Sequence, residues 1–170
     1  MSQRITLQTA EKTDIPFLHE LFNDKSVMDY WFTEPHFSLE KMEEMFRANQ
    51  ETKRNFIAIN EVGEKVGLVG LYFIDFRHRH AEFAIAFDPK QQGKGYAAEA
   101  TRLLLDYAFF TLNLHKVYLI VIASNEKAIH IYRKLGFEEE GMLKKHYFIN
   151  GTYEDGMMMG LFQEDYLAQK

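Results

Sequence analysis

The chain has 170 residues, of which 46% are hydrophobic and 26% charged, and its 20 basic and 25 acidic side chains give a formal net charge of −5 at pH 7. This size and composition indicate one soluble globular domain with a well-filled core, and the acidic balance argues against a protein that binds nucleic acid by neutralising phosphates. Since cysteine is absent, and neither a membrane-spanning run nor a signal peptide is recognised, we expect a cytoplasmic protein without disulfides or thiolate chemistry.

The first half of the chain predicts strands and two amphipathic helices, from alternating and helical spacing of its apolar residues. In chain order we expect a strand over 4–9, a helix over 13–23, a loop or broken helix over 25–37, a helix over 38–52, a hairpin of 55–60 and 65–76 around Gly63, a polar turn over 77–80, and a strand over 81–87. Thr13 and Ser38 are the expected N-caps, because a hydroxyl oxygen can accept from the free N–H groups of a first helical turn.

The second half predicts further alternation of helix and strand. We expect a long helix over 97–113, a central buried strand over 116–122, a short helix from Asn125 to Leu135 that Gly136 ends, and strands from 137 onward with the turn Asn150-Gly151 between 146–149 and 153–161. The resulting order is β, α, α, a three-strand meander, α, β, α and a terminal hairpin. It predicts a mixed α/β (α+β) fold on one sheet, in a single domain of residues 1–170.

The sequence Gln-Gly-Lys-Gly-Tyr-Ala at 92–97 is the most informative stretch, because it joins an expected strand to an expected helix. The first N–H groups of a helix lack internal partners and favour an anion, and Gly93 and Gly95 allow close approach of the backbone. This pattern predicts a phosphate-binding turn, with an ordinary flexible loop as the alternative.

The charge is unevenly distributed along the chain, because the segment 11–44 holds nine acidic and three basic side chains. Two solvated helix faces would explain it, and so would a surface that attracts a cation.

Together these features resemble the GCN5-related N-acetyltransferase (GNAT) superfamily, over nearly the whole chain in element order. The resemblance is carried by two motifs, which stand here as Gln92, Gly95 and Ala97, and as Asn125, Ala128, Tyr132, Gly136 and Phe137. It implies a sheet splayed at the strand that holds acetyl-CoA, the co-substrate. The residues that it implies for binding acetyl-CoA are Ile85, Ala86, Phe87, Gln92, Gly93, Lys94, Gly95, Tyr96, Ala97, Ala98, Asn125, Lys127, Ala128, Tyr132 and Lys134.

A closer resemblance is to the bacterial spermidine N-acetyltransferases. It is carried by residues 28–35, 67–69, 78–83, 112–118 and 149–151. It implies transfer of an acetyl group to a primary amine of spermidine or spermine, in a homo-oligomer such as a dodecamer, with no nucleic-acid or membrane partner. The resemblance also implies a separate polyamine-binding site beside the first two helices. Better-known members carry acids where this chain has Thr33, Lys41, Gly70 and Phe73, so the sequence leaves open whether that site or a divalent-metal site is present, and we expect no metal requirement.

Tyr132 and Glu82 are the candidate catalytic residues. A phenol stays protonated at neutral pH, so Tyr132 could act as the general acid for the leaving thiolate, although a packed core tyrosine would have the same spacing. Glu82 could accept the proton of the amine through water or pair with the cation, and a purely structural role is equally compatible with its position. A main-chain N–H near Phe87 is expected to polarise the thioester oxygen.

Met28, Trp31 and Glu34, together with Glu82, are the expected lining of an acceptor groove, where Trp31 would offer a cation–π face. Core packing is the competing interpretation of Trp31. His78 and His80 form a His-x-His pair without an evident third ligand, so we interpret them as solvated.

Two other functions share these motifs: a protein N-terminal acetyltransferase of the ribosomal-protein type, and a non-catalytic acyl-CoA-binding module. The sequence contains no Gly-x-Ser-x-Gly, no Walker A lysine and no His-Glu-x-x-His, so hydrolase, kinase and zinc-peptidase functions lack support.

Overall fold

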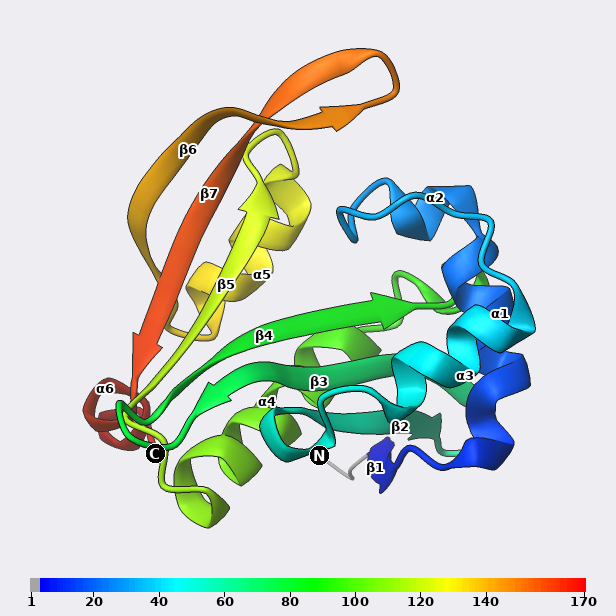
Figure 1. Ribbon diagram of the computed structural model, residues 1–170. Coiled ribbons are helices and arrows are strands. Elements are labelled where there is room, and N and C mark those ends of the chain that lie inside the picture. Colours follow the sequence, from blue (N-terminus) through cyan, green and yellow to red (C-terminus); the bar gives the residue numbers. More distant parts are fainter. Residues whose placement is uncertain (1–3) are drawn as a thin grey trace. The chain divides into compact units, whose positions relative to one another are not determined.

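The computed structural model describes residues 4–170 and shows a seven-stranded mixed sheet flanked by helices (Figure 1). The strands are β1 (Ile5–Thr9), β2 (Arg54–Asn60), β3 (Lys65–Asp75), β4 (His80–Phe87), β5 (Lys116–Ile122), β6 (Glu138–Ile149) and β7 (Thr152–Phe162). Their order in the sheet is β1-β2-β3-β4-β5-β7-β6. The β4–β5 pair is parallel, and β1–β2, β2–β3, β5–β7 and β6–β7 are antiparallel. The predicted mixed α/β fold on one sheet is thus confirmed.

The residues group into two compact units, one of 4–72 and 84–104 and the other of 73–83 and 105–170. The helices are α1 (Ile15–Asn23), α2 (Lys25–Met28), α3 (Leu39–Arg47), α4 (Tyr96–Asp106), α5 (Glu126–Lys134) and α6 (Gln163–Ala168). No helix within residues 4–170 is long and apolar enough to cross a membrane. The expectation of one domain over 1–170 stays a prediction.

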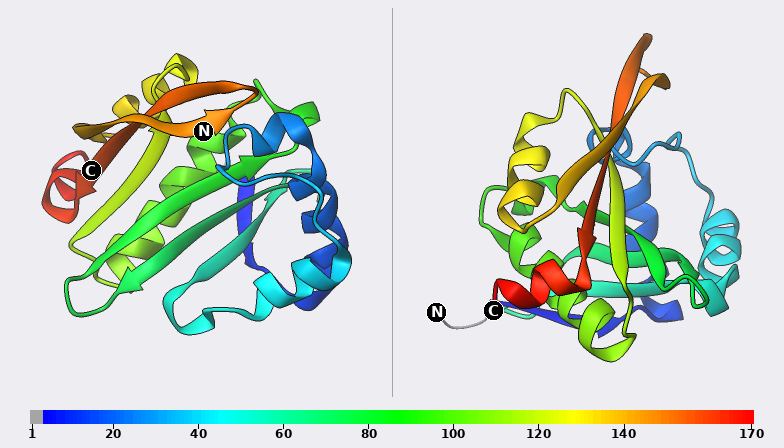
Figure 2. Two further views of the ribbon diagram at one scale, coloured as in Figure 1. Left: turned by 45° about the horizontal axis from the view of Figure 1, so that its top comes forward. Right: turned by 90° about the vertical axis from the view of Figure 1, so that its left-hand side faces the viewer.

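The first unit has its core between two helices and the strands. In Figure 1, α1 and α3 lie side by side, and their apolar side chains meet those of β2 and β3. Leu18 and Phe22 of α1, Met42 of α3, Ile57 of β2 and Leu68 of β3 are all buried in this cluster. Figure 2 shows α4 on the other side of the strands. The strands of the first unit therefore carry helices on both faces.

The second unit is built on β5, which pairs with β4 on one side and with β7 on the other. The β6–β7 hairpin turns at Asn150 (φ 50°) and Gly151 (φ 83°), the left-handed conformations that a two-residue turn requires. Helix α5 packs beside β4, where the Tyr132 ring meets Phe83 edge-on at 5.9 Å. The expected Asn-Gly turn and the central strand are confirmed.

Two helix boundaries differ from the predictions in the first half. Thr13 does not cap α1: it lies inside a 3-10 turn, Lys12–Asp14, where the N–H of Glu11 donates to Asp14 Oδ2 at 2.7 Å. The helix expected to reach residue 52 ends at Arg47, because Asn49 adopts a left-handed φ of 56° and starts a separate 3-10 turn. A capping box of Glu11 and Asp14 therefore stands where we expected the Thr13 cap, and the expected second helix is interrupted before Asn49.

The helix expected over 97–113 is also divided. α4 ends at Asp106 and continues as a π-helical turn, Tyr107–Thr111, where the N–H of Leu112 donates to the Tyr107 carbonyl at 3.0 Å. The segment expected to be a loop or broken helix contains the short helix α2, and α6 was not predicted. The Ser38 and Asn125 caps are confirmed, since each side chain accepts an N–H two or three residues into its helix.

Candidate active site

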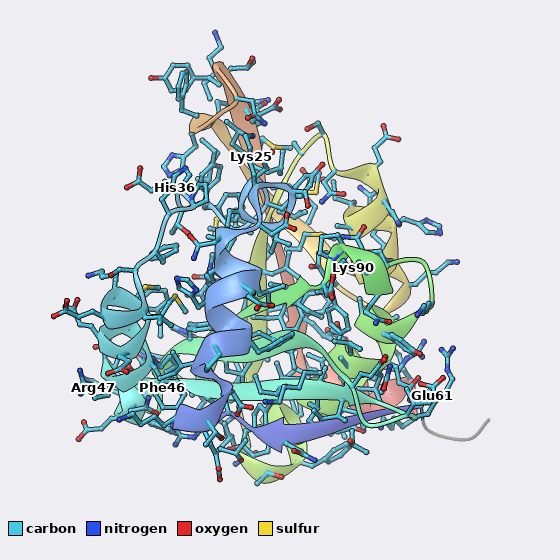
Figure 3. The ribbon with its side chains drawn as sticks, turned by 90° about the vertical axis from the view of Figure 1, so that its right-hand side faces the viewer. Lys25, His36, Phe46, Arg47, Glu61 and Lys90 are labelled. Atoms are coloured by element: carbon cyan, nitrogen blue, oxygen red, sulfur yellow. The ribbon has the colours of Figure 1, made fainter. Side chains whose placement is uncertain are left out.

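The glycine-rich turn lies in the first unit, between the end of β4 and the start of α4. A 3-10 turn, Pro89–Gln91, leads into it, capped by the side chain of Asp88, which accepts the N–H of Lys90 at 2.9 Å. Figure 3 labels Lys90 in this turn. Gly93 (φ 79°) and Gly95 (φ 80°) both adopt left-handed conformations that side chains disfavour. The two glycines are thus required by the path of the chain.

The start of α4 presents free main-chain N–H groups. The N–H of Glu99 donates to the Gly95 carbonyl at 3.3 Å, so the N–H groups just before Glu99 precede the first intrahelical bond. Residues 92–95 are exposed, as an anion cradle needs. Tyr96 offers only its main chain, because its ring is buried and its hydroxyl donates to Glu61 Oε2 at 2.9 Å. The geometry fits the expected phosphate-binding turn.

The last part of β4 supplies the expected thioester-binding strand. A Cβ placed on Gly67 would lie 2.6 Å from the carbonyl oxygen of Ala86 and 2.8 Å from the Phe87 ring, so only glycine allows β3 to approach here. The N–H of Asp88 donates to the Val66 carbonyl at 2.9 Å. Close packing therefore fixes the residues expected to meet acetyl-CoA.

Tyr132 lies on α5 in the second unit, in an aromatic cluster. Its ring meets Phe83 and Phe137 at centroid distances of 5.9 Å each, both edge-on. Desolvation raises the pKa of the Tyr132 phenol, which keeps it protonated at neutral pH. At the start of α5, the side chain of Asn125 accepts the N–H of Ala128 at 3.2 Å. Packing and a possible proton-donating role thus coincide at Tyr132.

The remaining residues expected on this helix differ in exposure. Lys127 and Lys134 project from α5 as exposed cations, and Gly136 ends the helix with a φ of 97°. Two exposed ammonium groups near a helix that carries the motif are compatible with a phosphate-bearing ligand.

Glu82 lies on β4 and is half-buried, and burial raises the pKa of its carboxyl group. Because successive residues of a strand point to opposite faces, Glu82 and Phe83 point apart, and Glu82 is on the face away from the Tyr132 ring. Tyr118, its partner in the β4–β5 pair, and Tyr147 interact electrostatically with Glu82. We did not predict these two tyrosines, although a parallel register of the two strands would have pointed to Tyr118.

The acceptor residues expected in the N-terminal segment lie in the first unit and have different surroundings. Met28 is buried in the core, which favours packing, and Glu34 is exposed. Trp31 packs edge-on against Phe22 at 5.1 Å and Tyr72 at 6.3 Å. It also lines a cavity of about 90 Å³, whose other lining residues are Leu18, Phe22, Met42, Met45, Phe46, Lys53, Asn55, Leu68 and Tyr72. Figure 3 shows Phe46 next to Arg47 at the end of α3.

The positions that lack the expected acids also have definite surroundings. Lys41 forms an ion pair with Glu44 at 2.9 Å, and Thr33 and Phe73 are exposed. A Cβ on Gly70 would lie 2.7 Å from Asn55 Oδ1 and 2.9 Å from Tyr72 Oη, so a larger residue here would have to displace these side chains.

Of the histidine pair, His78 is exposed as we expected, whereas His80 is less solvated than we expected. The rings of His78 and His80 stack at 6.2 Å, and His80 is half-buried with a buried Nδ1 that has no hydrogen-bond partner. Its side chain belongs to β4 and meets the Tyr118 ring at 5.8 Å. In residues 4–170, no cluster of three His, Cys, Asp or Glu side chains could hold a metal ion. The absence of a metal requirement stays a prediction.

Comparison with known proteins places this geometry in context. The acetyltransferase (GNAT) domain family matches residues 4–138. A protein named spermidine N(1)-acetyltransferase from Escherichia coli (strain K12) is 46% identical over 97% of this chain and 89% of the relative. The crystal structure of spermidine N-acetyltransferase from Vibrio cholerae in complex with CoA and spermine has a TM-score of 0.94 and 41% identity, over 98% of this chain and 99% of that one.

A second structure of the Vibrio cholerae protein, in complex with manganese ions, has a TM-score of 0.86 and 41% identity, over 98% of this chain and 97% of that one. The family match covers well over half of the chain and includes the glycine-rich turn, Tyr132 and Glu82. The fold, the turn and the full-length matches agree with one another, and this chain belongs to the GNAT acetyltransferase family.

Proposed function

We propose that this chain transfers an acetyl group from acetyl-CoA to a primary amine of spermidine or spermine. The observation that carries the proposal is the full-length match, at 46% and 41% identity, to relatives named for this reaction, one of them solved with CoA and spermine. An acidic segment at 11–44 and a half-buried carboxylate at Glu82 add support, because a polyamine is a polycation.

The first step is binding of acetyl-CoA. The turn 92–98 binds the pyrophosphate through its main-chain N–H groups, with Asn125, Lys127, Ala128 and Lys134 as further contacts. The main chain of 85–87 pairs with the amides of the pantetheine arm. Supporting this, the β4–β5 ladder has only three pairs, all before Phe83.

The second step is attack by the amine. An alkylammonium has a pKa near 10.4, so only roughly one molecule in 10³ is neutral at pH 7. Glu82 accepts the ammonium proton, directly or through water, and the amine nitrogen then attacks the thioester carbonyl. The N–H near Phe87 stabilises the resulting oxyanion.

The third step is departure of the thiolate. The carbon–sulfur bond breaks and the amide forms as the nitrogen loses its second proton to water, while Tyr132 donates its phenolic proton or a strong hydrogen bond to the sulfur. A thiol has a pKa near 8.5, below that of a buried phenol, so full proton transfer alone is uphill. Tyr132 therefore acts chiefly by stabilising the charge that develops on sulfur, and the released thiolate takes up a proton from solvent.

Trp31 and Glu34 belong to the same proposal as acceptor-binding residues, and we assign no substrate contact to the buried Met28. The proposal further includes a cytoplasmic location, a homo-oligomer and a reaction without a metal. Sedimentation of the purified protein and activity after treatment with a chelator test the last two points.

The decisive experiment is a mass-spectrometric panel of amine acceptors with acetyl-CoA. We expect acetylated spermidine and spermine, with much slower modification of peptides bearing a free N-terminus. Preferred modification of the peptides would indicate a protein N-terminal acetyltransferase instead. Calorimetric heat with coenzyme A but no product from any amine would indicate a non-catalytic acyl-CoA-binding module.

A further inference from the structure

One face of the second unit's strands gathers polar and aromatic side chains around Glu82. In the parallel β4–β5 pair, Glu82 is opposite Tyr118, so both side chains project from the same face. Ile120 follows two residues later on that face, opposite Met158 of β7. All four side chains are half-buried, whereas the alternate residues of these strands, such as Val117 and Leu119, are fully buried.

Tyr147 reaches this face from β6 by crossing β7. A Cβ placed on Gly156 of β7 would lie 2.6 Å from Cε2 of Tyr147 and 3.2 Å from Cγ2 of Ile120. The Tyr147 ring therefore lies over Gly156 and beside Ile120, one position along from Tyr118 on the same face. Only a glycine at 156 leaves room for this crossing.

A bulge in β6 precedes this crossing. The β6–β7 register shifts between Leu143 and Tyr147, and Lys145 adopts a left-handed φ of 48°. The N–H of Lys145 donates to Asp155 Oδ1 at 2.7 Å, which holds the irregular turn. The position of Tyr147 is thus set by a defined backbone feature.

A second side chain of β6, Glu140, crosses β7 on the same face, and there the carboxylate is paired with a cation. Gly160 leaves room for Glu140 of β6, whose carboxylate pairs with the ammonium of Lys116 at 2.6 Å. Lys116 is thereby neutralised by Glu140. Within residues 4–170 no Lys, Arg or His side chain forms an ion pair with Glu82.

Resting on the proposed function, we infer that Glu82, Tyr118 and Tyr147 form a carboxylate–aromatic site that binds the alkylammonium end of the acceptor. An ammonium favours a carboxylate together with the faces of electron-rich rings, and each contact gains strength as water is excluded. The structure assigns to Tyr118 and Tyr147 a substrate contact that depends on their rings.

The other groups on this face agree with a cation as the occupant. His80 meets the Tyr118 ring at 5.8 Å, and Lys116 and Glu140 neutralise each other. Burial and the neighbouring Glu82 carboxylate raise the pKa values of Tyr118 and Tyr147, so both phenols stay neutral. The Glu82 carboxylate therefore has no partner cation on this face, and an anion would be repelled.

Steady-state kinetics of Tyr147→Leu and Tyr147→Phe test the inference. Leucine removes the aromatic ring and phenylalanine keeps it, so we expect the KM for spermidine to rise about fivefold to tenfold in Tyr147→Leu and less than twofold in Tyr147→Phe. The KM for acetyl-CoA should change in neither. Phe148→Leu is the matched control, because Phe148 is an exposed aromatic residue next in β6 that packs on Tyr153.

Gly156→Ala and Gly160→Ala provide a second, independent pair. The alanine at 156 must displace the rigid Tyr147 ring and should raise the KM for spermidine as Tyr147→Leu does. The alanine at 160 meets the flexible ends of Glu140 and Lys116 and should leave the KM for spermidine unchanged. Equal KM values for spermidine in wild type and Tyr147→Leu would overturn the inference while leaving the proposed reaction intact. Absence of polyamine turnover in the wild type would instead refute the proposed function.

Discussion

The two faces of the strands in the second unit have the same backbone and opposite characters. On one face, Phe83, Val117 and Leu119 are buried, and α5 packs against Phe83. On the other, Glu82 and Tyr118 are half-buried and polar. Because the side chains of a strand alternate, one run of residues supplies packing to one face and chemistry to the other.

Tyr132 is an exception to this separation of packing and chemistry. It belongs to the packed face, with its ring against Phe83 and Phe137, yet it is the candidate proton donor. A side chain held by two aromatic neighbours has few rotamers, so packing positions the hydroxyl at no further cost in conformational entropy. Substitutions on the two faces should therefore separate stability from chemistry, except at Tyr132.

The largest expected effect is a loss of stability on substitution of a residue on the packed face. Phe137→Ala removes a buried ring, 2% exposed, and should lower the free energy of unfolding by about 3–5 kcal/mol. Phe148→Ala, which removes an exposed ring from the hairpin, should cost less than about 1 kcal/mol. Chemical denaturation measures both values. Similar losses for the two variants would contradict the assignment of Phe137 to the core.

Next comes Tyr132→Phe, which keeps the ring and removes the hydroxyl. We expect kcat to fall about a hundredfold, the lower range for loss of a general acid, with calorimetric affinity for coenzyme A nearly unchanged. Stability should also change little, because the ring contacts with Phe83 and Phe137 remain. An unchanged kcat together with weaker coenzyme A binding would assign Tyr132 to packing and ligand contact alone.

On the polar face, Glu82→Gln should lower kcat/KM for spermidine about tenfold at pH 7. Burial raises the pKa of Glu82, so the wild-type activity should decline on acidification at a higher pH than an ordinary carboxyl group would give. This acidic limb should disappear from the pH profile of Glu82→Gln. Persistence of the limb would assign it to another group.

The same raised pKa makes a prediction for stability. Between the unfolded and the higher folded pKa, the native state holds a proton that the unfolded chain has lost, so stability falls as pH rises through this range. Glu82→Gln should remove this fall. Its melting temperature should exceed that of the wild type above the range and match it below.

The sequence predicted the fold well where local signals agreed with packing. The Asn-Gly turn, the Asn125 cap and the central strand were all identified because turn chemistry, capping and β-branched composition act locally. The errors arose where two local signals competed. The hydroxyl of Thr13 predicts a cap, whereas Glu11 and Asp14 form the capping box. The apolar spacing of 38–52 predicts one helix, whereas Asn49 is left-handed.

The candidate site was predictable only in part, for a physical reason. The glycine turn and Tyr132 belong to motifs whose spacing is fixed along the chain. Tyr147 joins Glu82 through a bulge at Lys145 and a close crossing at Gly156, both of which depend on strand register. Register between distant strands is set by tertiary pairing, so neither contact leaves a local signal.

The smallest effect is expected at Asn125, where α5 begins, and it distinguishes a role in stability from a role in binding coenzyme A. Asn125→Ala removes the acceptor for the Ala128 N–H and should cost about 1 kcal/mol of stability, as Ser38→Ala should at the start of α3. If Asn125 also contacts acetyl-CoA, only Asn125→Ala should weaken coenzyme A binding, by about threefold. Asn125→Ser, which can still cap, should recover the stability and not the affinity. Recovery of both would leave Asn125 as a cap alone, with α5 positioning Tyr132 through its first turn.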